Sequence, residues 1–192
     1  MPIQGVIFDL DGTVVENSYD WPKIREELGN ENVPILTYLS GLEEPERSWK
    51  WAILERHEAE QTSRSQARAG IRELLFFLKR AGLRTALVTN NSRGNTVELV
   101  ERFRLAFDLI LTRESGLWKP SGAPFRKVLG AFGIGGDACC VVGDSRFDVL
   151  AAADAGIRFI FLLGGGASKF AGPPVEVFPA VPGLKARLEE LL

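Results

Sequence analysis

From Gly70 onward, short apolar segments alternate with amphipathic segments of about ten residues. The apolar segments contain almost no polar positions, which indicates strands that are buried on both faces. This alternation is typical of a parallel sheet with helices on both sides. We predict strands at 83–89, 107–112, 138–142 and 158–163, and helices at 71–81, 96–103, 124–132 and 147–155.

The two ends of the chain extend this pattern. We predict a first strand at 2–10, an edge strand at 175–178 and a closing helix at 183–192. Residues 20–68 show helical periodicity without a convincing strand, and Gly29, Gly41 and Pro45 divide them into short helices. The predicted fold is α/β: a doubly wound, mainly parallel, Rossmann-like sheet with helices on both faces. We assign 1–15 and 70–192 to a discontinuous catalytic core, and 16–69 to a small all-helical cap.

The composition excludes several classes of protein. A chain of 192 residues is long enough for one core with a modest insertion. The net charge of −2 gives no reason to expect a nucleic acid or an anionic membrane as a partner. No apolar run approaches the roughly 20 residues of a membrane span, and because the chain enters the first strand directly we expect no export leader. Cys139 and Cys140 are adjacent in an apolar strand, so we expect buried thiols and a cytoplasmic protein.

Polar residues follow each of the predicted core strands. The first strand ends in Asp9 and Asp11, although burying an unpaired carboxylate costs several kcal/mol. In open parallel sheets, ligands bind beyond the carboxyl ends of the strands. We therefore expect one rim to collect the polar residues that follow the other strands, namely Thr89, Asn90, Asn91, Lys119, Asp144 and Asp148.

Four carboxylates cannot all stay ionised at one rim without a compensating cation. Lys119 supplies one positive charge, and a divalent ion with oxygen ligands would supply the remainder, for which Mg²⁺ is suited. A phosphate would complete the site, held by Thr89, backbone amides and Lys119. Asp9 would then attack phosphorus to give an aspartyl-phosphate. Asp11 would protonate the leaving oxygen and later take a proton from the hydrolytic water.

Four short motifs carry a resemblance to a known family. DLDGT at 9–13, TNN at 89–91, KP at 119–120 and GDSRFD at 143–148 resemble, in order, the motifs of the haloacid dehalogenase-like (HAD) hydrolase superfamily. The similarity spans the whole core. The spacing resembles phosphoglycolate phosphatase-like members, in which a helical cap follows the first motif.

The resemblance implies a role for each matching residue. It implies Asp9 as nucleophile, Asp11 as general acid/base and Lys119 as the charge-neutralising lysine. The phosphate contacts that we assign are Gly12, Thr89, Asn90 and Lys119, and Gly12 also allows a sharp turn. The implied Mg²⁺ ligands are Asp9, the backbone carbonyl of Asp11, Asp144 and, in support, Asp148. The usual KPxP pattern is KPSGAP here, so we expect a reshaped loop at 121–124.

Other residues receive ordinary structural interpretations. Gly164-Gly165-Gly166 is not followed by G-K-[ST], so we predict a turn rather than a phosphate-binding loop. We place the cap tryptophans in the cap's own apolar core. His57 lies among charged residues, which favours a solvated side chain. The tryptophans concerned are Trp21, Trp49 and Trp51.

The leading functional hypothesis is a Mg²⁺-dependent phosphatase acting on a small phosphorylated metabolite, of which phosphoglycolate-like and sugar phosphates are examples. A phosphomutase acting on a sugar phosphate would use the same core residues. A haloacid dehalogenase would leave Asp11 and Asp144 unexplained. A non-catalytic member that binds a metabolite or a protein would be expected to lack Asp9, Asp11 or Lys119, and all three are present. Monomer and homodimer both remain open.

Overall fold

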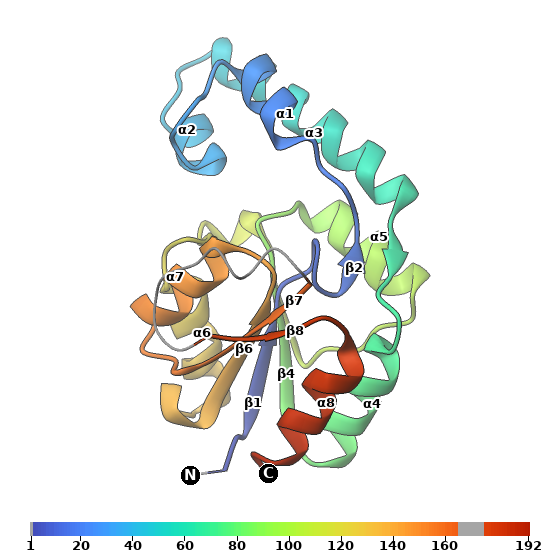
Figure 1. Cartoon of the computed structure of the whole chain (residues 1–192). Helices are drawn as coiled ribbons and strands as arrows, with labels where there is room; N and C mark the ends of the chain where they lie inside the picture. The colour runs from blue at the N-terminus through green and yellow to red at the C-terminus, as the bar shows by residue number, and fades with distance from the viewer. Residues whose placement is uncertain (1, 165–174) are drawn as a thin grey trace. The chain divides into compact units, whose positions relative to one another are not determined.

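The computed structural model describes residues 2–164 and 175–192. The chain divides into two units: a core of Met1–Glu16 and Gln66–Leu192, and a helical insert of Asn17–Ser65. The core therefore comes from both ends of the sequence (Figure 1).

A parallel sheet forms the centre of the core. In the described part of the chain it has six strands in the order β5-β4-β1-β6-β7-β8, and each neighbouring pair is parallel. Ile7 in the central strand pairs with Ala86 on one side and Val141 on the other. The strands are β1 (Gly5–Phe8), β4 (Arg84–Val88), β5 (Leu109–Leu111), β6 (Cys139–Gly143), β7 (Phe159–Leu163) and β8 (Val175–Phe178). The prediction of an α/β fold with a parallel sheet is confirmed.

Helices cover both faces of the sheet (Figure 1). Successive side chains of a strand point to opposite faces, so Val6 and Phe8 enter one apolar cluster and Ile7 enters the other. The first cluster includes residues of α4 and α8, and the second includes residues of α6 and α7. The core helices are α4 (Ile71–Arg80), α5 (Arg93–Arg102), α6 (Ala123–Phe132), α7 (Arg146–Asp154) and α8 (Val181–Glu189).

The helical insert has a small apolar core of its own. Its helices are α1 (Trp21–Leu28), α2 (Ile35–Ser40) and α3 (Glu46–Arg64). The Asp20 side chain caps α1 by accepting a hydrogen bond from the Lys23 N–H. The side chains of Ile24, Leu28, Leu39 and Leu54 are buried.

Two of the three tryptophans of the insert do not follow the prediction, whereas Trp51 is half-buried. Trp49 is 62% exposed and Trp21 is 45% exposed, so the expectation that they form the apolar core of the insert is wrong. Trp21 stacks on Tyr19 with 4.6 Å between the ring centroids. Smaller aliphatic side chains fill the interior instead, and the helical spacing alone does not reveal which face of each helix is buried.

The connections between the core and the insert include a short ladder that the sequence does not reveal. β2 (Val15–Glu16) and β3 (Gln66–Ala67) pair antiparallel within the core. The predicted helical region thus ends at Arg64, and residues 66–69 belong to the core rather than to the insert. A strand of two residues is too short to produce a periodic pattern, so the periodicity of the sequence does not predict it.

Three smaller observations complete the fold. Cys139 and Cys140 are free and buried, as predicted. Gly164 has a positive φ of 97°, in keeping with the predicted turn, whereas Gly165 and Gly166 lie outside the described residues. None of the helices in residues 2–164 and 175–192 combines the length and the apolar character that crossing a bilayer requires.

Candidate active site

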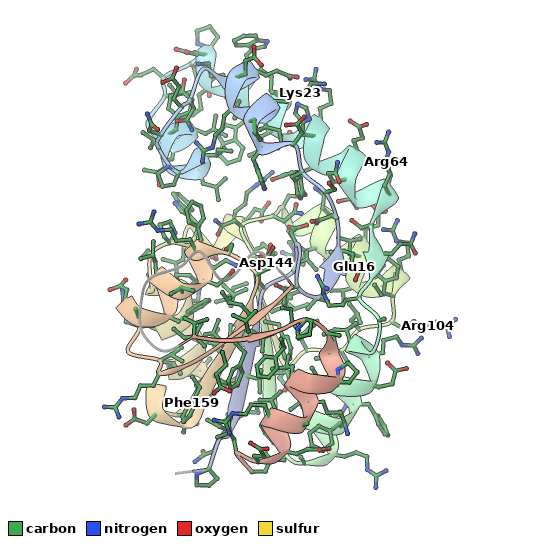
Figure 2. The ribbon with its side chains drawn as sticks, in the orientation of Figure 1. Glu16, Lys23, Arg64, Arg104, Asp144 and Phe159 are labelled. Atoms are coloured by element: carbon green, nitrogen blue, oxygen red, sulfur yellow. The ribbon has the colours of Figure 1, made fainter. Side chains whose placement is uncertain are left out.

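The site lies at the carboxyl ends of the central strands. Asp9 directly follows β1, Thr89 follows β4 and Asp144 follows β6. Because these strands are parallel and adjacent, their ends meet at one edge of the sheet. Figure 2 shows Asp144 at this edge, whereas Phe159, at the start of β7, lies toward the other end of the sheet.

Lys119 is the centre of a buried ionic cluster. Its Nζ lies 2.6 Å from Asp9 Oδ1 and 2.6 Å from Asp148 Oδ1. The Lys119 side chain is 3% exposed, and that of Asp148 is fully buried. Each of Asp9, Asp144 and Asp148 also has a carboxylate oxygen within 4.8 Å of those of the other two. The structure thus brings four of the predicted site residues into one cluster.

The crowding of negative charge shifts the acid–base behaviour of the cluster. Burial raises the pKa of Asp9 well above its usual value; Lys119 opposes this shift, and Asp148 and Asp144 add to it. Burial and the nearby Asp148 carboxylate raise the pKa of Asp144 to about 7. Burial lowers the pKa of Lys119, but Asp148 and Asp9 outweigh this effect, so its pKa is raised and the ammonium stays charged.

Asp148 is fixed by the start of helix α7. Its Oδ2 accepts hydrogen bonds from Ser145 Oγ (2.6 Å), the Ser145 N–H (3.1 Å) and the Asp144 N–H (3.3 Å). A Cβ on Gly143 would lie 2.4 Å from Asp148 Cγ, so only glycine allows this approach. Asp148 therefore holds both Lys119 and the turn that carries Asp144.

The Asn90 side chain holds the loop that carries Lys119. Asn90 Nδ2 donates to the Lys119 carbonyl and Asn90 Oδ1 accepts from the Lys119 N–H, both at 2.9 Å. The amide is thus committed to the backbone of this loop, and the phosphate contact assigned to Asn90 stays a prediction. Further along the KPSGAP segment, the Gly122 N–H donates to Asp154 Oδ2 at 2.6 Å, which anchors the segment to α7.

The turn after β1 places Gly12 against Asp144. Gly12 has a φ of 77°, and a Cβ there would lie 2.0 Å from Asp144 Oδ2. Arg68 holds this turn by donating from Nε to the Thr13 carbonyl at 2.7 Å and from Nη2 to the Gly12 carbonyl. Sequence reasoning missed Arg68, because it lies 55 residues from Thr13 and belongs to no motif.

Asp11 and Thr89 meet through Asn91. Asn91 Nδ2 donates to Asp11 Oδ2 at 3.0 Å, and the Asn91 N–H donates to Thr89 Oγ1 at 3.0 Å. The Asn91 side chain is buried. Asn91 belongs to the TNN motif, and its position next to Thr89 and Asn90 is the sequence signal for a role at the site.

The cluster has the composition of a divalent-metal site. Three carboxylates and one ammonium leave two negative charges, which a divalent cation would balance. All the nearby acidic ligand atoms are carboxylate oxygens, the type that Mg²⁺ prefers. The residues present therefore fit the Mg²⁺ that the sequence predicts.

The fold and the ionic cluster define an α/β enzyme with its site at the carboxyl edge of a parallel sheet, and comparison with known proteins identifies the family. The sequence model of the haloacid dehalogenase-like hydrolases matches residues 3–156. A phosphoglycolate phosphatase of Nitrosospira multiformis is 30% identical over 184 residues, covering 81% of each chain. An uncharacterized hydrolase of Saccharomyces cerevisiae is 27% identical, covering 83% of this chain and 77% of its own.

A solved structure is similar over almost the whole chain. CbbY from Rhodobacter sphaeroides, crystallised in complex with phosphate, has a TM-score of 0.71 and 25% identity. The match covers 95% of this chain and 96% of that one. The chain belongs to the haloacid dehalogenase-like hydrolase family, and it is accordingly a hydrolase.

Proposed function

We propose that this hydrolase is a Mg²⁺-dependent phosphatase that cleaves a small phosphomonoester metabolite. The observation that carries the proposal is the pairing of buried Asp9 with Lys119 at 2.6 Å, beside the carboxylates of Asp144 and Asp148. A net negative cluster of this kind requires a cation before it can accept a phosphate. The phosphatase name of the Nitrosospira relative and the phosphate bound to CbbY agree with this chemistry.

In the first step, an Asp9 carboxylate oxygen attacks phosphorus and the bond between phosphorus and the leaving oxygen breaks. Asp11 gives a proton to that oxygen, so the product leaves as an alcohol. Lys119 neutralises charge on the transferring group, and the proposed role of the Thr89 hydroxyl is to donate a hydrogen bond to a phosphoryl oxygen. The result is a phosphoryl group bound covalently to Asp9.

In the second step, water attacks phosphorus and the bond to Asp9 breaks, which releases inorganic phosphate. Asp11, now ionised, takes the proton of that water. Asp9 returns to its carboxylate form. Asp11 thus acts first as an acid and then as a base. The proton that it gives to the leaving oxygen is replaced by the proton that it takes from water.

The proposed Mg²⁺ ligands are Asp9, the backbone carbonyl of Asp11 and Asp144, with Asp148 in support. When bound, the ion would supply two positive charges that favour ionised Asp9 and stabilise the charge of the phosphoryl group. The fit of the donor set supports this assignment. The proposed role of the helical insert is to act as a cap that admits a compact substrate.

The test is a phosphate-release panel run with and without Mg²⁺. The substrates are 2-phosphoglycolate, glycerol 3-phosphate, glucose 6-phosphate and p-nitrophenyl phosphate. We expect metal-dependent release that Asp9→Asn reduces by at least about 1000-fold, because the nucleophile is lost. Asp137→Asn is the matched control, since Asp137 is exposed, and we expect it to keep wild-type activity.

Two results would contradict the proposal. Substantial turnover by Asp9→Asn would exclude Asp9 as the nucleophile. Conversion of glucose 6-phosphate to an isomeric phosphate, with no inorganic phosphate released, would identify a phosphomutase instead.

A further inference from the structure

The Asn91 amide has a defined orientation at the start of helix α5. Asn91 Oδ1 accepts from the Ser92 N–H at 2.7 Å and from Asn95 Nδ2 at 3.0 Å. The Ser92 backbone N–H can only donate, so this end must be the oxygen, because an NH₂ group accepts no hydrogen bond. The other end, Nδ2, therefore faces Asp11 as a donor, at 3.0 Å from Oδ2.

This contact fixes one oxygen of the Asp11 carboxyl group. Oδ2 accepts a hydrogen bond from a buried amide whose orientation is set at its other end. The carboxyl group can turn only by giving up this hydrogen bond, so the contact holds its orientation at the site.

We propose that Asn91 is a positioning residue that acts through Asp11. It holds the Asp11 carboxyl group in the orientation from which that group delivers a proton to the leaving group. The inference rests on the proposed function, because it concerns the acid of that reaction. The role belongs to the side chain of Asn91 and is separate from those assigned to Thr89 and Asn90.

The hydrogen bond to Asp11 is not needed to start the helix. The Ser92 side chain already caps α5 by accepting from the Asn95 N–H, and the Asn91 backbone is held by Thr89 Oγ1 and by the Arg113 N–H. Asn91 Oδ1 also serves the first turn of the helix. The Nδ2 donor, in contrast, contacts a catalytic carboxyl group.

The test compares two leaving groups in the same protein. An alkoxide needs a proton as it departs, whereas p-nitrophenolate leaves readily without one. Asn91→Ala should lower kcat/KM about 10- to 100-fold for the alkyl phosphomonoester of the panel that the wild type hydrolyses fastest. The loss for p-nitrophenyl phosphate should be less than about 3-fold. The ratio of the two kcat/KM values does not depend on how much of the enzyme is folded.

Further variants separate positioning from structure. In an Asp11→Asn background, Asn91→Ala should change the alkyl kcat/KM by less than about 2-fold, because the group through which it acts is absent. Asn91→Asp keeps the shape and the oxygen toward Ser92 but replaces the donor, so it should show the same leaving-group dependence as Asn91→Ala. Asp137→Asn, the exposed control of the phosphate-release panel, should leave the ratio at its wild-type value.

The outcomes are distinct. Equal losses for both leaving groups in Asn91→Ala and Asn91→Asp, with an active wild type, would overturn the positioning role and leave the phosphatase intact. A full additional loss in the Asp11→Asn background would also overturn it. A wild type that hydrolyses no phosphomonoester would overturn the proposed function itself, and this inference with it.

Discussion

The central ion pairs of the core and the ion pairs on the surface of the insert lie in different environments. In the core, Asp9, Lys119 and Asp148 form ion pairs that are almost completely buried. In the insert, ion pairs such as Arg64–Glu60 lie on the surface of α3. Exposed pairs contribute little to stability, whereas breaking a buried pair leaves an uncompensated charge. The buried pairs of Lys119 with Asp9 and Asp148 lie at the edge of the sheet where the chemistry is proposed.

The two regions also differ in their aromatic residues. The insert exposes Trp21 and Trp49, while Phe8 and Phe161 in the sheet are fully buried. The insert is held by a few aliphatic side chains, so much of its surface is not constrained by packing. Packing therefore constrains the aromatic side chains of the sheet more closely than the exposed tryptophans of the insert.

The largest contrast between the core and the insert, in both activity and stability, should come from replacing Lys119 in the core. Lys119→Met should lower phosphate release about 100- to 1000-fold, because the transferring group loses its neutralising charge. It should also lower the free energy of unfolding by about 3 kcal/mol, since two buried carboxylates lose their partner. Phosphate release and urea unfolding at pH 8 measure the two effects.

The matched control breaks an ion pair in the insert. Arg56 donates to Glu27 on the surface, and its side chain is 63% exposed. Arg56→Met should leave the midpoint of urea unfolding unchanged. Equal destabilisation by the two substitutions would contradict the contrast between the core and the insert.

A smaller effect should appear in the pH dependence of the metal-free protein. Burial and Asp148 raise the pKa of Asp144 from its usual 3.8 to about 7. Between these two pH values, the Asp144 carboxyl group therefore holds a proton in the folded state that it has released in the unfolded state. This stabilisation is complete below the unfolded pKa and is lost as the pH rises through about 7. In EDTA, the free energy of unfolding should fall by roughly 2 to 4 kcal/mol between pH 4 and pH 8.

Mg²⁺ and Asp144→Asn should each reduce this pH dependence, as measured by urea unfolding at the two pH values. Glu27 in the insert has the opposite sign: the hydrogen bond from His57 lowers its pKa, so its contribution is lost as the pH falls. If the metal-free wild type were as stable at pH 8 as at pH 4, and Asp144→Asn behaved in the same way, the raised pKa of Asp144 in the buried acidic cluster would be contradicted.

The smallest effect should come from the exposed aromatic surface of the insert. Trp49→Ala removes a side chain that is 62% exposed, so the free energy of unfolding should change by less than about 0.5 kcal/mol. Leu54→Ala, on the same helix but 2% exposed, should cost about 2 to 5 kcal/mol. Similar losses of unfolding free energy for the two variants would contradict the exposed position of the Trp49 side chain.

Much of the core was predictable from local patterns. The strands are apolar throughout and the helices between them are amphipathic, so both types of element follow from periodicity. The clustering of Asp9, Lys119 and Asp144 follows from topology, because adjacent parallel strands bring their carboxyl ends together.

Other features depend on partners that are distant in sequence. Arg68 reaches carbonyls more than 50 residues away, and Asn90 holds the backbone of Lys119 29 residues away. The prediction of a solvated His57 is wrong, since its side chain is 13% exposed and lies 3.1 Å from Glu27. These contacts are set by how elements pack, and the periodicity of a single segment does not contain that information.

The β2–β3 ladder has a consequence for modularity. Val15 pairs with Ala67, and Glu16 with Gln66, so the chain leaves and re-enters the core at directly opposed residues. Opposed residues in an antiparallel pair have Cα atoms about 5 Å apart, a gap that a two-residue hairpin turn can close. Excising 17–65, or grafting a foreign domain in their place, would therefore leave the catalytic scaffold topologically whole.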